Sequence, residues 1–520
     1  MSDWIATQLS GIFIVYCFAL GNLVYHSLFY FAQLVLGFFS RKAFFDYLGS
    51  EFLGLNTTAS NLLGFLNLAE LGVSAAICYF LYQPLYEKDY DKLNKLVTIQ
   101  GWIYRKVAYI IIGASLVLMS FFPMIFSKTS LPLWYAYCMF GVLLFSSILG
   151  YFYNYKQIVL YADQKNYKIQ QYVQGTVILK TVFQILAVTS FPYPFFSWLF
   201  LEAFGAVVTT LVLNNILRKE YPWLKTNTRN GKYYLKEYPD VITKTKQIFF
   251  HRIGAVILGQ SSPLIVYGFT NLTIVALYGN YVLIISKISA MLNSVFSSTA
   301  AAVGDLVASK DDKQIRKVFW ELYDSRMCIS TIVILCLYHL TNPFITIWLG
   351  KGYCLSQTFL LLFVLLNSIN MTRTTVDNYL NAYGLYKDVW APLTEAVINI
   401  CLSILFGLYW GLNGIILGIL VSQILIISIW KPYFLFREGF HKRAKDYFLP
   451  VIYRYSIVAT MFVLSYYAFV PLNVGQITTV KNFIAAFFIV GLCNSVIVSI
   501  VFYLLFPSVR DFVNRFSKRL

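Results

Sequence analysis

Apolar runs of about twenty residues recur along the whole sequence, separated by short turns or by charged segments. An α-helix of this length crosses the hydrocarbon core of a bilayer, which is roughly 30 Å thick. Helices and closed barrels alone satisfy every backbone polar group in that core. Charged residues make up only 12% of the chain, about half the share of an average soluble domain. The sequence therefore predicts an all-α polytopic membrane protein.

Hydropathy predicts about fourteen membrane-spanning helices, with ends uncertain by about two to four residues. The predicted spans are 12–39, 56–82, 103–126, 132–160, 169–189, 195–217, 247–269, 273–304, 321–348, 356–384, 389–409, 413–434, 451–470 and 481–506. Most of the 41 Lys and Arg residues follow even-numbered spans or lie in the C-terminal tail. The positive-inside rule places such residues in the cytoplasm, so both termini are predicted to be cytoplasmic.

The longest hydrophilic connection divides the spans into two groups. It is rich in Lys and Tyr, contains two prolines and follows the sixth predicted span. Two lobes of about six helices around a central cavity are a common transporter arrangement. The predicted organisation is an N-lobe (1–217), a basic cytoplasmic linker (218–246), a C-lobe (247–434), two further C-terminal helices (451–506) and a basic cytoplasmic tail (507–520).

Several kinds of site are not expected in this chain. The eight cysteines form no CxxC pair and no Cys/His cluster, so neither a disulfide framework nor a metal site is predicted. Walker motifs are absent from the sequence, so no ATP hydrolysis and no cofactor are predicted. The net charge of +18 fits a basic rim facing anionic lipid headgroups, and nucleic acid is not an expected partner.

Six segments carry a family resemblance in order along the chain. They are YLGSEFLGLNTTASNLLGFLNLAELGVSAAI (47–77), YQPLYEKDYDKLNKLV (82–97), LTIVALYGNYVLI (272–284), AAAVGDLVASKDDK (300–313), NPFITIWLGKGY (342–353) and GLNGIILGILVSQ (411–423). Together they resemble the bacterial polysaccharide transporters of the O-antigen and capsule flippase type. That family belongs to the multidrug/oligosaccharidyl-lipid/polysaccharide (MOP) exporter superfamily.

The resemblance implies a central cavity and a lipid-linked oligosaccharide as cargo. In the family the oligosaccharide is carried on undecaprenyl pyrophosphate and is flipped from the cytoplasmic to the outer leaflet. Arg41 falls where many members carry an arginine. Two departures stand out, because Gly37 replaces a frequent proline and the segment 260–268 lacks a frequent acidic residue. They put in doubt a kink of the first helix and a carboxylate for ion coupling in the seventh.

Charged residues inside the predicted spans are candidate functional groups, because a charge in the bilayer core is costly. Lys180 and Glu202 lie at similar depth in neighbouring helices, which favours a structural ion pair. Arg373 and Asp377 have the i, i+4 spacing of a pair on one helix face, and Glu395 is placed to join them.

Lys287 is predicted to have no acidic residue on its hairpin partner. It is interpreted as a contact for the pyrophosphate, as a partner of Glu70 across the cavity, or as a structural side chain that reaches the inner rim. The candidate cargo contacts are Lys287, Arg41, Lys42, Arg252 and Arg373. The candidate coupling or gating groups are Glu70, Asp377 and Glu395, and neither catalytic residues nor metal ligands are predicted.

The sequence thus favours an alternating-access flippase of the bacterial cytoplasmic membrane rather than an enzyme. Its expected partners are a lipid-linked oligosaccharide, membrane lipids and other polysaccharide-assembly proteins, and an ion gradient or the membrane potential would drive it. One alternative is a multidrug cation antiporter of the same superfamily. The other is a membrane glycosyltransferase or polymerase, which usually needs longer outer loops than this chain has.

Overall fold

The described part of the chain is helical throughout. A computed structural model describes residues 32–163, 165, 168–296, 299–308, 310–385, 388, 390–470 and 477–517. Within these residues ten helices are long and apolar enough to cross a membrane, or eleven when the bent pair Ser50–Glu70 and Val73–Glu87 is one span. The predicted class, an all-α polytopic membrane protein, is confirmed.

The predicted number of spans differs from this count for three local reasons. The first predicted span begins at residue 12, whereas the described residues begin at 32. Helix α12 (Asp240–Phe269) starts with charged residues, and only Val256–Phe269 counts as an apolar helix. The last two spans of the predicted C-lobe fall within one helical segment, Trp390–Gly439.

That segment is a hairpin rather than one long span. Its first helix, α18 (Trp390–Gln423), is interrupted at Gly411, which has φ 54° and ψ −134°. A residue with a side chain rarely adopts such a conformation, so glycine permits the turn. The Ser403 hydroxyl donates a hydrogen bond to the Ile415 carbonyl over 3.3 Å, which joins the two arms. The two spans predicted on either side of residue 411 are therefore both present.

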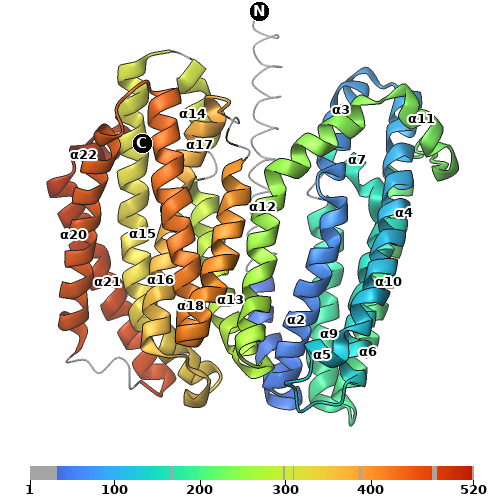
Figure 1. Cartoon of the computed structure of the whole chain (residues 1–520), viewed down its shortest axis with the longest axis horizontal. Coiled ribbons are helices and arrows are strands. Elements are labelled where there is room, and N and C mark those ends of the chain that lie inside the picture. Colours follow the sequence, from blue (N-terminus) through green and yellow to red (C-terminus); the bar gives the residue numbers. More distant parts are fainter. Residues whose placement is uncertain are drawn as a thin grey trace, which may run out of the picture. The chain divides into compact units, whose positions relative to one another are not determined.

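The chain divides within α12 into two compact units, Met1–Val256 and Ile257–Leu520 (Figure 1). In the first unit, α9 and α10 form a hairpin, and α6 packs against α2, α4 and α10. The elements of this unit are a helix over 32–48, α2 (Ser50–Leu66), η1 (Asn67–Glu70), α3 (Val73–Glu87), α4 (Tyr90–Ser120), α5 (Phe122–Ile125), α6 (Trp134–Phe152), η2 (Asn154–Gln157), α7 (Ile158–Ala162), η3 (Ile169–Gln174), α9 (Gly175–Ser190), α10 (Pro194–Glu220), η4 (Thr228–Asn230) and α11 (Gly231–Glu237).

The predicted linker, 218–246, is folded against α4 of the first unit. The Asn94 side-chain amide donates to the Trp223 carbonyl over 3.1 Å, and its oxygen accepts from the Lys225 backbone over 2.8 Å. A Cβ atom on Gly231 would lie 2.2 Å from Cβ of Trp102, so only glycine allows this close approach. The linker is therefore a fixed part of the first unit.

In the second unit the long helix α15 contacts many of the other elements, among them α16, α20, α21 and α22. The elements of this unit after α12 are α13 (Leu272–Phe296), α14 (Thr299–Ala308), α15 (Asp312–Trp348), η5 (Lys351–Tyr353), α16 (Gln357–Thr372), α17 (Thr374–Ala382), α18, η6 (Ile424–Trp430), α19 (Lys431–Phe434), η7 (Leu435–Gly439), α20 (Lys445–Phe469), α21 (Val480–Leu505) and α22 (Pro507–Ser517).

A buried ion pair ties the C-terminal helices to α15. The Asp324 side chain is fully buried, and its Oδ2 accepts a hydrogen bond from Nη2 of Arg454 on α20 over 2.7 Å. Ser508 of α22 donates to the same oxygen. The Arg454 guanidinium lies over the Trp320 ring, 4.3 Å from its centroid. Arg515 of α22 adds an ion pair of 3.0 Å with Glu321.

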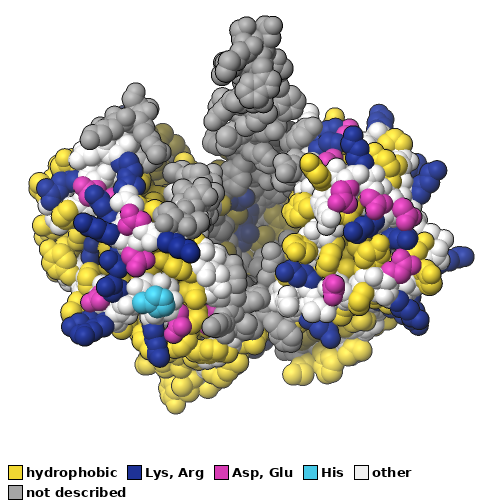
Figure 2. Space-filling model, turned by 90° about the horizontal axis from the view of Figure 1, so that it is seen from above, with side chains coloured by type: hydrophobic (Ala, Val, Ile, Leu, Met, Phe, Trp, Pro, Cys, Tyr) yellow, Lys and Arg dark blue, Asp and Glu magenta, His cyan; other side chains and the backbone are white. Residues whose placement is uncertain are grey.

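Charged side chains gather on one face of each unit. Figure 2 shows that face, where Lys and Arg alternate with Asp and Glu among hydrophobic side chains. In the first unit, Lys95 pairs with Asp91 and with Glu237 of α11 over 3.0 and 3.3 Å. In the second, Lys317 pairs with Asp511 of α22 over 2.8 Å. The connections that the sequence assigns to the cytoplasm thus form local ion pairs.

The substitution Asp324→Asn should destabilise the protein by about 3–5 kcal/mol, because it leaves the Arg454 guanidinium buried without its carboxylate. Thermal unfolding of the purified protein measures the loss, and limited trypsin digestion at Arg510 and Arg515 reports whether α22 is released. The control Asp511→Asn breaks a half-exposed pair and should cost at most about 1 kcal/mol. Equal stability of the two variants would contradict the proposed importance of Asp324.

Candidate functional site

The second unit contains a polar cavity of about 460 Å³ between α13, α15, α16 and α17. Its lining includes two arginines, three asparagines and one carboxylate: Arg326, Arg373, Asn293, Asn370, Asn378 and Asp377. The site lies where α16 gives way to α17. Thr372, at the end of α16, donates its hydroxyl back to the Ser368 carbonyl over 3.0 Å, a contact that often accompanies a bend in a helix.

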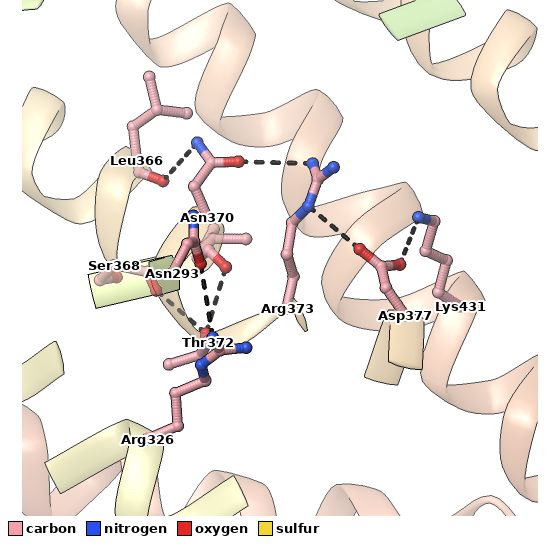
Figure 3. Close-up of polar contacts among 10 residues, drawn as sticks. Asn293, Arg326, Leu366, Ser368, Asn370, Thr372, Arg373, Asp377 and Lys431 are labelled. Carbon is pink, nitrogen blue, oxygen red and sulfur yellow. Dashed lines mark hydrogen bonds and ion pairs between the residues drawn. The ribbon is translucent and has the colours of Figure 1, made fainter. Parts of the chain in front are cut away.

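One wall of the cavity is a charged cluster that the sequence predicted in part (Figure 3). Nε of Arg373 lies 3.3 Å from Oδ2 of Asp377, as the i, i+4 spacing suggested. Nζ of Lys431, from α19, lies 2.7 Å from the other carboxylate oxygen. Nη1 of Arg373 also donates to the Asn370 side chain over 3.5 Å. Asp377 thus binds two cations at once.

Arg326 is a cavity residue that the sequence reasoning did not select. Its side chain comes from the middle of α15, and the residue is only 5% exposed. Nη2 donates to Oδ1 of Asn293 over 3.4 Å, and the guanidinium lies 4.5 Å from the centroid of the Phe296 ring. Within the described residues it forms no ion pair with a carboxylate. The available signal was a lone arginine inside an apolar run.

The cluster has more positive than negative charge. Glu395 of α18 is buried near Arg373 and Lys431, but no described residue donates a hydrogen bond to its Oε1. With Arg326 included, three cations face the two carboxylates Asp377 and Glu395. A cavity with this balance attracts anions.

The ion pair predicted between Lys180 and Glu202 is present in the first unit. Nζ of Lys180 lies 2.7 Å from Oε1 and 2.8 Å from Oε2 of Glu202, and both side chains are largely buried. The Gln184 amide donates to Oε2 over 2.9 Å. Because both charges are compensated within the α9–α10 hairpin, this geometry suits a structural role.

Glu70 lies at a break in a membrane-spanning segment. The segment bends by 45° between η1 and α3, and Gly72 at the break has φ 94°. Glu70 lines a cavity of about 400 Å³ in the first unit and accepts a hydrogen bond from the Tyr104 hydroxyl. Two further oxygens at this cavity, Oε1 of Gln100 and Oδ1 of Asn154, accept no hydrogen bond from the described residues.

The remaining predicted contacts are scattered. Arg41 is half-buried in the helix over 32–48, and Lys42 beside it pairs with Asp46 over 3.1 Å. Lys287 is half-buried on α13 and lies outside the lining of the cavity around Arg326. The side chain of Arg252 lies outside the described residues. A contact between Lys287 and Glu70 would join the two units and stays a prediction.

No family model and no curated protein matches the sequence. Two solved structures match it over most of its length. One is described as lipid II flippase MurJ in an inward closed conformation, with a TM-score of 0.62, 16% identity, and coverage of 94% of this chain and 100% of the other. The second is an inward-facing multidrug resistance MATE family transporter of the MOP superfamily, with a TM-score of 0.59, 12% identity, and coverage of 78% and 95%.

The chain has the MOP exporter fold. The predicted resemblance is thereby confirmed at the level of the fold. The MOP fold places membrane-spanning helices around each of the two cavities described above, so both polar clusters lie among helices built for a bilayer.

The substitution Lys180→Met should lower the free energy of unfolding by about 3–5 kcal/mol, because the buried Glu202 carboxylate loses its cation. The double variant Lys180→Met/Glu202→Gln should recover most of that loss, since no uncompensated charge remains. Thermal unfolding compares the variants. The exposed pair Lys42 and Asp46 is the control, with a change of at most about 1 kcal/mol for Lys42→Met. A double variant no more stable than the single one would contradict an isolated structural pair.

Proposed function

We propose that this protein is an alternating-access flippase for a lipid-linked oligosaccharide that carries a diphosphate. The excess of positive charge at the cavity of the second unit is the observation that carries the proposal. The fold supports it, since one of the similar structures is described as a lipid II flippase. The polysaccharide, O-antigen or capsule pathway suggested by the family resemblance belongs to the same proposal.

The cavity chemistry fits the polar end of such a cargo. A diphosphate bears at least two negative charges and cannot enter the bilayer core without compensation. The guanidinium groups of Arg326 and Arg373 are suited to phosphate, because each offers a planar fork of donors. Asn293, Asn370 and Asn378 supply further hydrogen-bonding groups for phosphate or sugar hydroxyls. The polyprenyl chain would stay in the surrounding lipid.

A cationic drug fits this cavity less well. The second similar structure is described as a multidrug resistance transporter, so the same fold accommodates that function. A cation entering the cavity would approach Arg326, which has no carboxylate partner among the described residues. The sign of the charge therefore favours the anionic cargo.

The proposal also assigns a place and further partners. The basic connections put the protein in the bacterial cytoplasmic membrane with both termini in the cytoplasm. Lys287, Arg41, Lys42 and Arg252 are proposed as additional contacts along the path of the cargo. Other polysaccharide-assembly proteins would supply the lipid-linked unit and use it after translocation.

Arg326→Gln and Arg373→Gln should each reduce flipping of a lipid-diphosphate-linked sugar by about tenfold to a hundredfold. A charged hydrogen bond contributes about 1.5–3 kcal/mol, which corresponds to that range. Proteoliposomes with a fluorescent lipid-linked sugar measure the rate as loss of signal to a reductant outside the vesicle.

The control for these two variants is Arg437→Gln, because Arg437 is 65% exposed and lies outside the cavity lining. Its rate should equal that of the unmodified protein. Unchanged flipping in both cavity variants, with normal folding, would contradict the assignment of the cavity. Flipping of a cationic dye but not of the lipid-linked sugar would support the antiporter alternative.

Glu70 is proposed as the group that couples transport to a cation gradient. The carboxylate, the Tyr104 hydroxyl and the two unpaired amide oxygens of Gln100 and Asn154 present oxygen ligands around one cavity. Oxygen ligands of this kind suit a hard cation such as Na⁺, and a carboxylate also accepts a proton. Discontinuous helices commonly hold coupling ions in transporters.

Glu70→Gln should abolish the stimulation of flipping by an imposed Na⁺ or proton gradient while leaving the rate without a gradient unchanged. The same proteoliposomes measure both rates. Glu87→Gln is the control, because Glu87 is an exposed carboxylate at the end of the adjacent helix α3. Stimulation that survives in Glu70→Gln would exclude Glu70 as the coupling group.

A further inference from the structure

A second basic cavity lies in the first unit, beneath the folded linker. It has a volume of about 400 Å³ and is formed where residues 226–229 cover the ends of α4, α6 and α10. Its lining includes three cationic side chains from three separate elements: Arg105 of α4, Lys156 of η2 and Arg229 of η4. The proposed transport does not use this cavity.

The three cations have no carboxylate partners in the described part of the chain. The nearby carboxylates of Asp163 and Glu220 are already used, because Asp163 pairs with Lys165 over 2.7 Å and Glu220 pairs with Lys168. Desolvation and the positive charge of Arg218 lower the pKa of Lys156. Like charges are thus held together without an internal counterion, which costs free energy unless an anion binds.

The walls of this cavity are fixed. The hydroxyls of Tyr155 and Thr226 are 2.9 Å apart and join η2 to the linker. Gly101 of α4 leaves so little room that a Cβ atom would lie 2.6 Å from Cγ2 of Thr228. The cationic side chains therefore extend from a preorganised frame rather than from a loose surface loop.

Aromatic residues place the cavity at the edge of the bilayer. The membrane-spanning helix α6 ends at Phe152, and Tyr153 beside it is 55% exposed. Both residues line the cavity, and exposed Tyr is typical of the membrane–water interface. A phosphate group at this depth belongs to a lipid headgroup, whose acyl chains can extend along the adjoining helices.

We infer that the cavity lined by Arg105, Lys156 and Arg229 binds the phosphate headgroup of an anionic phospholipid. Basic pockets between membrane helices near the cytoplasmic surface recognise such headgroups. The bound lipid would neutralise the three cations and connect the linker to α4, α6 and α10. This lipid is separate from the proposed cargo, and the inference holds whether or not the protein is a flippase.

Binding can be measured by native mass spectrometry of the purified full chain in detergent, with thermal unfolding as a second readout. Phosphatidylglycerol should remain bound and raise the unfolding temperature, whereas phosphatidylcholine with the same acyl chains should not. The triple variant Arg105→Gln/Lys156→Gln/Arg229→Gln should bind phosphatidylglycerol roughly a hundredfold more weakly, since each basic residue near an anionic lipid contributes about fivefold.

The matched control is Lys219→Gln/Lys232→Gln/Lys236→Gln, which removes the same charge from exposed positions of the same unit outside the cavity. It should keep the affinity. Equal losses in the two triple variants would overturn the inference, because general surface attraction would explain them. A further arm adds inorganic phosphate, and full competition by phosphate at millimolar concentration would indicate a free-phosphate site instead of a lipid site.

The single variant Lys156→Gln covers the case in which the triple variant does not fold. It should weaken phosphatidylglycerol binding by about fivefold and leave the elution volume on size exclusion unchanged. Unchanged affinity in a folded Lys156→Gln protein, or an unmodified protein that does not prefer the anionic lipid, would also overturn the inference.

Discussion

A charge placed among apolar helices must be compensated within the protein or by a ligand, and this constraint organises every polar cluster of this structure. Lys180 and Glu202 satisfy it completely inside one hairpin. Asp324 and Arg454 satisfy it between α15 and α20 and thereby fix the C-terminal helices. Such internally neutral pairs account for stability.

The remaining cationic clusters satisfy the constraint only in part. Around Arg326 and Arg373 the described residues supply fewer negative than positive charges. Around Lys156 they supply no paired carboxylate at all. An uncompensated charge lowers stability, so its persistence is explained most simply by a ligand that completes it. The same reasoning separates functional clusters from structural ones without reference to any family.

The sequence predicted what depends on local periodicity. Helix length, the pair Arg373 and Asp377 at i, i+4, and the Lys180–Glu202 contact within a hairpin all follow from spacing and depth. Arg326 was missed as a cavity residue because its placement depends on how α15 is rotated against α13 and α16. The contact between Ser508 and Asp324 joins distant parts of the chain, and no local pattern encodes it. The same holds for the linker, whose fold depends on Asn94 and Trp102 of α4.

The folded linker changes where movement between the units can occur. Composition alone suggested a flexible tether over 218–246, yet this segment packs on α4, and the division between the units falls inside α12. Alternating access would therefore require α12 itself to bend or rotate, since a continuous helix transmits motion where a loose loop would absorb it. The acidic cavity at Glu70 and the basic cavity at Arg326 belong to different units. Coupling between a cation and an anionic cargo would then pass through that helix.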